Sequence, residues 1–224
     1  MWDIYDQLIE LIPENLEIKE IAQTTRWTLV DSGQGVGTAM NFPKMGEADG
    51  KKYQGHSLRT VTELVKSWNY GEASIGLAAI NSYLNAPQQY EKAFAGHKID
   101  VQDALNPLPE LVKEQKIGMI GHFGFVDQYP QDKEGLTIFE LAPRPGDYPA
   151  AAAEFLLPQM DRVYVTASTL VNKTLPRLLQ LSRGPVILVG SSCPLTPVLF
   201  RHGIDVVAGT SYDTTIYQLQ QREQ

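Results

Sequence analysis

Short apolar runs alternate with helical stretches along the second half of the chain. The runs are rich in β-branched residues and recur about every twenty residues, at Lys116–Ile120, Leu136–Leu141, Arg162–Thr166, Val186–Val189 and Asp205–Ala208. Helical patterns lie between or after them, at Pro149–Met160, Leu175–Leu181, Pro197–His202 and Thr214–Glu223. Almost continuously apolar strands that alternate with helices are typical of a parallel sheet covered on both faces. The pattern therefore predicts a Rossmann-like α/β domain over residues 116–224.

A different pattern begins the chain. Apolar residues at helical spacing predict a first helix that ends at Pro13. Three short strand-like runs follow, at Ile18–Ala22, Trp27–Val30 and Gly37–Met40. Polar and glycine-containing segments separate these runs, which favours an antiparallel meander.

Two more helices are predicted after the meander. A capping box from Thr60 to Glu63 would begin the first of them. The second, Glu72–Leu84, carries many small side chains, which would allow close packing within the fold or across a homodimer. We expect an N-terminal α+β domain over residues 1–86 and a connector with one helix over residues 87–115.

Composition and charge narrow the class of protein. The chain has 224 residues, of which 43% are hydrophobic and 20% charged, as in ordinary globular proteins. A formal net charge of -7 argues against non-specific binding to nucleic-acid phosphates. No apolar run reaches membrane-spanning length, and the acidic first residues do not resemble a signal peptide. We expect a cytoplasmic protein without nucleic-acid or membrane partners.

Polar residues and glycines gather just after the predicted parallel strands. In a doubly wound domain these positions share one edge of the sheet, where ligands bind at the point at which the strand order reverses. The candidate ligand-binding residues are Gly121, His122, Phe123, Glu140, Ser168, Thr169, Asn172, Thr174, Gly190, Ser191, Ser192 and Thr210. Two helices, capped by Thr174 and Thr196, are expected to begin at the same edge, and their free N–H groups favour an anionic ligand.

A metal site is a further hypothesis for this edge. If the five strands run in the order 3-2-1-4-5, the ends of strands two, one and four are neighbours. Glu140, His122 and Cys193 would then project together, and carboxylate, imidazole and thiolate are a credible ligand set for a transition metal. The alternative is that His122 packs beside Phe123 and that Cys193, the single cysteine, is a small buried residue.

The rival class is an enzyme. Gly118, Gly121 and Gly124 do not form the dinucleotide fingerprint, and no nucleophile motif surrounds Cys193. A transferase or lyase with a nucleotide-like or anionic cofactor, held by Glu140 and the loops of Ser168 and Ser191, is nevertheless open. His122 would be its best general acid or base.

Four segments resemble one known family, the proteins described as "putative heavy-metal chelation". They are Glu72–Asn81, Gly121–Phe123, Ala167–Asn172 with Thr174, and the run from Gly190 to Gly209 that contains Pro194–Phe200. The resemblance implies an enolase N-terminal-like domain followed by a Rossmann-like domain, with a ligand cleft between them and a role in metal or cofactor metabolism. Cys193 stands where a proline or another small residue is expected in relatives. Together, residues and resemblance predict a protein that binds a small anionic or metal-bearing ligand.

Overall fold

A six-stranded parallel sheet forms the core of the second domain. The computed structural model describes residues 2–94, 101–128 and 135–222. The strands of this sheet are β4 (Ile117–Ile120), β5 (Leu136–Glu140), β6 (Tyr148–Pro149), β7 (Arg162–Thr166), β8 (Val186–Val189) and β9 (Val206–Ala208). All neighbouring pairs are parallel. The five predicted strands are thus present, and the two-residue edge strand β6 was not predicted.

The strand order corrects the predicted one. The sheet runs β6-β5-β4-β7-β8-β9, so the third predicted strand, β7, lies between the first, β4, and the fourth, β8. The predicted order placed the first and fourth strands side by side. The reversal point lies between β4 and β7, and the loops after these two strands therefore form the crevice of the domain.

Helices cover both faces of the sheet. Alternate residues of β7 serve opposite faces: Val163 and Val165 pack into one buried cluster and Tyr164 into another. The helices of the domain and connector are α4 (Pro87–Phe94), α5 (Val101–Leu105), α6 (Leu108–Leu111), α7 (Ala153–Leu156), α8 (Leu175–Leu181) and α9 (Ile216–Arg222), with 3-10 turns η3 (Gly124–Gln128), η4 (Ala150–Ala152), η5 (Leu157–Gln159), η6 (Ala167–Leu170) and η7 (Pro197–His202).

Several helix predictions need correction. The stretch Pro149–Met160 is divided into η4, α7 and η5, with Pro158 in the last turn, and Pro197–His202 is a 3-10 helix. The described part of the connector contains three helices where one was predicted. Residues 95–100 lie outside the described part, as does Glu223, the last residue of the predicted helix Thr214–Glu223.

The N-terminal domain is an antiparallel sheet packed against α3. Strands β1 (Glu20–Gln23), β2 (Trp27–Asp31) and β3 (Val36–Met40) form the predicted meander. Helix α3 (Tyr70–Leu84) is almost entirely buried inside the fold. A β-carbon on Gly37 would lie 2.1 Å from the carbonyl oxygen of Ala78, so glycine permits the close approach of β3 to α3.

The remaining short elements are α1 (Asp3–Glu10), η1 (Gly50–Tyr53), α2 (Leu58–Thr62) and η2 (Glu63–Lys66). The predicted capping box is wrong. Ser57, not Thr60, caps α2, because its side chain accepts a hydrogen bond from the N–H of Thr60. No helix within the described ranges is long and apolar enough to cross a membrane.

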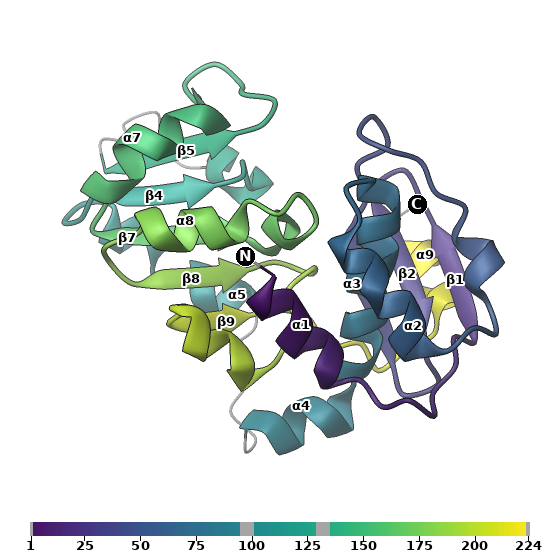
Figure 1. The fold of residues 1–224 in the computed structure, drawn as a ribbon. Coiled ribbons are helices and arrows are strands. Elements are labelled where there is room, and N and C mark those ends of the chain that lie inside the picture. The colour runs from purple at the N-terminus through teal and green to yellow at the C-terminus, as the bar shows by residue number, and fades with distance from the viewer. Residues whose placement is uncertain (1, 95–100, 129–134, 223–224) are drawn as a thin grey trace.

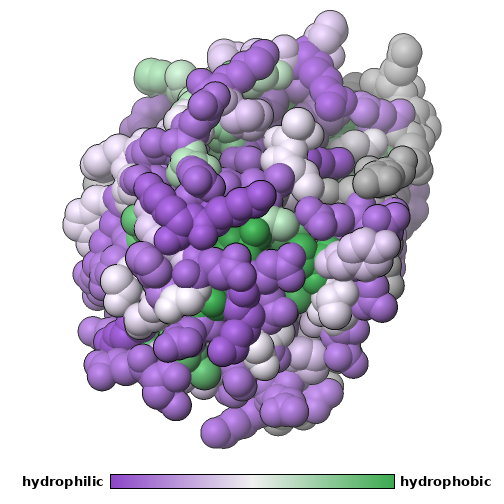
Figure 2. All heavy atoms as spheres, turned by 90° about the vertical axis from the view of Figure 1, so that its right-hand side faces the viewer, coloured by the Kyte–Doolittle hydropathy of each residue, from purple (hydrophilic) through white to green (hydrophobic). Residues whose placement is uncertain are grey.

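Both ends of the chain tie the two domains together. Helix α1 lies between them in Figure 1, and the Tyr5 hydroxyl donates a hydrogen bond to the carbonyl of Leu170 at 3.1 Å. Helix α9 returns to the first domain, where Ile216 and Leu219 pack against Leu29 of β2. The side of that domain shown in Figure 2 is mostly hydrophilic, with only small apolar areas.

Two asparagines of the α3 region clamp the loop after β8. Asn85 donates to the carbonyls of Cys193 (2.9 Å) and Thr210 (3.2 Å) and accepts from the N–H of Leu195 (2.8 Å). Asn81 donates to the carbonyl of Ser192 at 3.0 Å and to that of Thr38 in β3 at 2.8 Å. Both side chains are buried, so these bonds replace water at the domain interface.

Replacing Asn85 tests this clamp. We expect Asn85→Ala to lower the free energy of unfolding by roughly 2–4 kcal/mol, because buried backbone groups of the β8 loop lose their partners. Urea denaturation followed by circular dichroism measures the effect. Asn106→Ala removes an exposed side chain that, among the described residues, is hydrogen-bonded to Gln102. It is the matched control and should change stability by less than about 0.5 kcal/mol. Equal losses in the two variants would contradict the clamp.

Candidate functional site

A cavity of about 240 Å³ lies at the carboxyl ends of β4, β5 and β7 and is closed by residues of the N-terminal domain. Eight of the predicted ligand-binding residues line it: Gly121, His122, Phe123, Glu140, Ser168, Thr169, Asn172 and Thr174. Most of the wall is apolar, including Ile120, Phe139 and Leu178. The cavity therefore combines an apolar body with a few polar groups, as small-molecule sites generally do.

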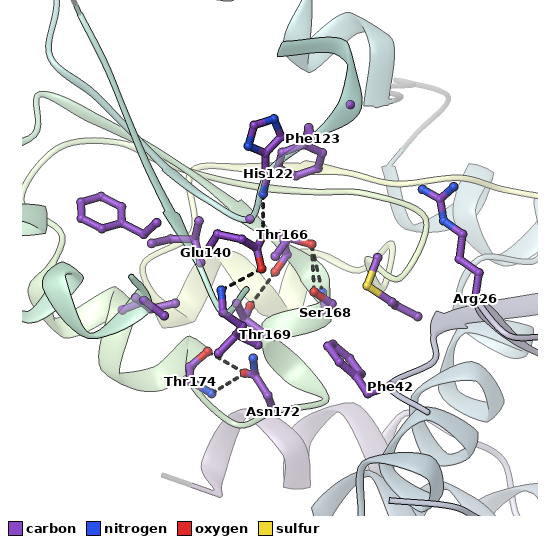
Figure 3. Close-up of a pocket in the computed structure, with 18 residues that line it drawn as sticks. Arg26, Phe42, His122, Phe123, Glu140, Thr166, Ser168, Thr169, Asn172 and Thr174 are labelled. Carbon is purple, nitrogen blue, oxygen red and sulfur yellow. Dashed lines mark hydrogen bonds between the residues drawn. The ribbon is translucent and has the colours of Figure 1, made fainter. Parts of the chain in front are cut away.

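The loop after β7 forms the polar corner of the cavity (Figure 3). Thr166 caps η6 and lies 3.0 Å, hydroxyl to hydroxyl, from Ser168. The Asn172 side-chain oxygen accepts hydrogen bonds from the N–H (3.0 Å) and hydroxyl (2.6 Å) of Thr174. These bonds fix the loop and use the oxygen of the Asn172 amide. Its NH₂ group makes no hydrogen bond with the described residues and can donate to a ligand.

The Glu140 carboxylate is already bound by the backbone. Its Oε2 atom accepts from the N–H of His122 at 2.8 Å, and its Oε1 atom accepts from Leu141 at 2.7 Å and Ala142 at 3.3 Å. A carboxylate with three backbone donors is a structural anchor between the ends of β4 and β5. Its capacity to hold a metal or a ribose hydroxyl is correspondingly reduced.

The His122 ring lies between two carboxylates. Its Nδ1 atom is 2.9 Å from Asp147 and its Nε2 atom is 2.8 Å from Asp127, and in Figure 3 the ring turns away from Glu140. Carboxylates only accept, so both contacts are hydrogen bonds when the ring carries a proton on each nitrogen. Arg144 completes the group with a 2.9 Å ion pair to Asp127.

This arrangement affects Asp127 and restricts His122. The hydrogen bond from His122, with help from Arg144, holds the pKa of the Asp127 carboxyl below its usual value. Because both ring nitrogens of His122 are engaged, neither is free to act as a base or a metal ligand in the described arrangement. The ring instead joins the loop after β4 to the loop after β5 at the rim of the cavity.

Three residues of the N-terminal domain complete the wall, and sequence reasoning missed them. Arg26, at the turn before β2, Met40 at the end of β3, and Phe42 line the cavity opposite the sheet. Figure 3 shows Arg26 and Phe42 across from Glu140. Among the described residues no acid forms an ion pair with Arg26, whose guanidinium lies 5.5 Å from the centroid of the Trp27 ring. Only the contact between domains brings these residues to the site.

The other four predicted ligand-binding residues are placed elsewhere. Gly190, Ser191, Ser192 and Thr210 do not line the cavity. The Ser191 carbonyl accepts from Thr38 at 2.7 Å, and the Ser192 hydroxyl accepts from the N–H of Met40 at 2.9 Å. Because β8 lies one strand beyond the reversal point, its loop contacts the N-terminal domain instead of the crevice.

The predicted metal set is not assembled. The intervening strand β7 separates the ends of β4 and β8, so Cys193 is not beside His122 and Glu140. Its thiol is fully buried, 3.7 Å from the carbonyls of Leu188 and Pro194, and burial raises the pKa of the thiol. Within the ranges that the structure describes, no three His, Cys, Asp or Glu residues are grouped to hold a metal ion.

The two predicted helix starts also differ. Thr174 lies at the cavity and precedes α8, but its side chain does not cap that helix. Thr196 caps η7 and is buried away from the cavity, beside a separate surface hollow. An anionic ligand in the cavity would thus meet Arg26 rather than two converging helix ends.

Comparisons with known proteins agree with the expected family. The family model DUF364 matches residues 103–219 and the model DUF4213 matches residues 5–84, and both are described as "Putative heavy-metal chelation". The chain is 28% identical to an uncharacterized protein of Methanocaldococcus jannaschii over 71% of its own length and 66% of that protein.

Two solved structures of DUF364 proteins of unknown function are similar as well. One, from Desulfitobacterium hafniense, has 42% sequence identity and a TM-score of 0.79 over 91% of this chain and 84% of that one. The other, from Pyrococcus horikoshii, has 24% identity and a TM-score of 0.65 over 87% and 80% of the two chains, and supports the fold alone. These likenesses confirm the predicted two-domain α/β fold.

The burial of Cys193 generates a prediction about metal binding. We expect Cys193→Ala and the unaltered protein to give superimposable calorimetric isotherms when titrated with Zn²⁺, because a buried, protonated thiol does not coordinate metal. Circular dichroism verifies that the variant is folded. A one-to-one zinc site present in the unaltered protein and absent from Cys193→Ala would restore the thiol as a ligand.

Proposed function

This chain belongs to the DUF364 family, described as "Putative heavy-metal chelation", and we propose that its cavity binds a small organic anion, either free or as a metal chelate. The observation that carries the proposal is the composition of the cavity wall. Apolar side chains from both domains surround a space of about 240 Å³, and one corner offers the hydroxyl and amide groups of the loop after β7. Such a wall fits a partly apolar molecule with a polar end.

Arg26 supports the anionic character of the ligand. Arg26 lines the cavity without an ion-pair partner among the described residues, whereas the Glu140 carboxylate opposite accepts hydrogen bonds from three backbone N–H groups. A carboxylate or phosphate on the ligand would give Arg26 a charge-assisted, bidentate partner. The ligand would then span the two domains, with its acid at Arg26 and its polar end at Asn172 and Thr174.

The cavity fits a metal only as part of an organic chelate. His122, Glu140 and Cys193 do not converge, and the first two have their polar atoms engaged by protein groups. The described residues therefore do not fit a bare metal ion held by the protein. A chelate brings its own donor atoms, so the protein needs only to recognise the organic part. The rival enzymatic function gains no support from His122, because both of its ring nitrogens are bonded.

A neutral fluorescent probe tests the cavity. We expect Phe42→Ala to weaken binding of N-phenyl-1-naphthylamine by about tenfold, since it removes one aromatic wall worth roughly 1.4 kcal/mol. Phe155→Ala removes a phenyl ring that is 75% exposed and lies outside the cavity, and serves as the matched control. Fluorescence titration at constant salt measures both. The cavity proposal fails if the two variants bind the probe equally well.

An anionic probe tests Arg26. The sulfonate 1-anilinonaphthalene-8-sulfonate has the same ring system with one added charge. Arg26→Gln should weaken its binding by about tenfold, the loss of one charge-assisted contact, and leave the neutral probe unchanged. Arg183→Gln, at an exposed position outside the cavity, controls for the change in net charge. Equal weakening by Arg26→Gln and Arg183→Gln would mean that only overall charge matters.

A further inference from the structure

Lys173 is a buried ammonium directly behind the cavity. It is 6% exposed, although lysine is rarely buried, and it lies between Asn172 and Thr174, which both line the cavity. Its φ of 64° is in the left-handed region, which is unfavourable for a residue with a β-carbon. An unfavourable backbone and a buried charge at one position indicate that specific contacts hold the side chain there.

Those contacts come from both domains. The Nζ atom donates to the carbonyl of Ser67 in the N-terminal domain and, at 2.7 Å, to the carbonyl of Val171 in its own loop. It also lies 6.0 Å from the centroid of the Trp68 ring and 5.9 Å from that of Tyr70. Two carbonyls and two aromatic faces are favourable neighbours for a cation.

The same contacts reach both walls of the cavity. The Tyr70 ring packs edge to face against Phe42, with 5.6 Å between centroids, and Phe42 lines the cavity from the N-terminal domain. On the opposite wall, Asn172 and Thr174 are the chain neighbours of Lys173. One ammonium group thus connects an aromatic wall of one domain to the polar corner of the other.

The charge of Lys173 has no direct counter-ion in the described structure. The titratable groups near it are Tyr70 and Glu72, and the Glu72 carboxylate is bound at 2.7 Å by the hydroxyl of Ser67. No carboxylate among the described residues forms an ion pair with Lys173. Burial accordingly lowers the pKa of the ammonium to about 8.

We propose that Lys173 is a positioning residue whose ammonium holds the two walls of the cavity at their working separation, so that the cavity binds its ligand less tightly once the ammonium loses its proton. The neutral amine retains two N–H groups, but it loses the charge that strengthens both hydrogen bonds and attracts both rings. The inference rests on the proposed function for its ligand readout only.

Permanent and absent charges give a matched pair of variants. In the unaltered protein, affinity for N-phenyl-1-naphthylamine, which has no acid group, should fall about fivefold to tenfold as pH rises through about 8. Lys173→Arg keeps its charge throughout this range, so its affinity for the probe should not change with pH. Lys173→Met should bind weakly at every pH, and Lys113→Met, an exposed lysine, should follow the unaltered protein.

Stability should move in the opposite direction, which separates positioning from simple unfolding. Between about 8 and the ordinary value of 10.5, the unfolded chain binds a proton that the folded chain does not. The free energy of unfolding therefore rises with pH in this window relative to Lys173→Met. Falling affinity together with rising relative stability is the expected result.

A ligand-free measurement keeps the two proposals distinguishable. Tryptophan fluorescence should show a transition near pH 8 that Lys173→Met lacks. The terminal amine titrates in the same range, but that titration would remain in Lys173→Met, so the variant distinguishes the two groups. A transition dependent on Lys173, with no probe binding in any form, would contradict the proposed function alone. Identical pH profiles for fluorescence and probe binding in the unaltered protein and Lys173→Arg would overturn the role of Lys173, even if Lys173→Met did not fold.

Discussion

The hydrogen bonds of Asn81 and Asn85 to the loop after β8 are the constraint on which the site depends. They bind one strand-end loop of the parallel sheet to α3. Strand β3 packs closely against α3 at Gly37, so its position relative to that loop is fixed as well. Once this loop is fixed, the end of β3 lies over the crevice between β4 and β7. The cavity is consequently an interface between domains, and Arg26, Met40 and Phe42 are wall residues that a Rossmann-like domain alone would not supply.

Local sequence patterns predicted the strands well, because a strand buried on both faces is a short, almost continuously apolar run. The limits of β7 and β8 match the predicted runs, and α8 begins and ends where expected. No local pattern predicts the strand order, since the pairing between β4 and β7 depends on contacts across more than forty residues of chain. The type of helix was not predicted either. Pro158 lies in η5 and Pro197 begins η7, and the periodicity of so few residues does not distinguish a 3-10 helix from an α-helix.

The candidate site residues divide in the same way, into those that local sequence position predicts and those that depend on contacts between distant parts of the chain. Gly121, His122, Glu140 and Asn172 were found from their places after β4, β5 and β7, which any doubly wound sheet would bring to one edge. Ser191 and Ser192 satisfy the same rule and yet lie at the domain interface, because the rule does not say which loop a second domain will cover. Arg26 and Phe42 had no signal of their own, since a hairpin turn with an arginine is usually only a solvated turn.

Among the described residues no three His, Cys, Asp or Glu side chains are grouped to hold a metal ion, and the ionisable groups around the cavity explain why. Glu140 and His122 have the right chemistry for coordination, but their acceptor and donor atoms are consumed in joining the strand-end loops to one another. A carboxylate that accepts three backbone hydrogen bonds has little acceptor capacity left for a metal ion, and freeing more of it would break the bonds that position its loop. Arg26 lies across the cavity from Glu140, where its positive charge would oppose a bare cation and favour an anion. Electrostatics and geometry thus support the proposal of an acidic organic ligand, with any metal carried inside it.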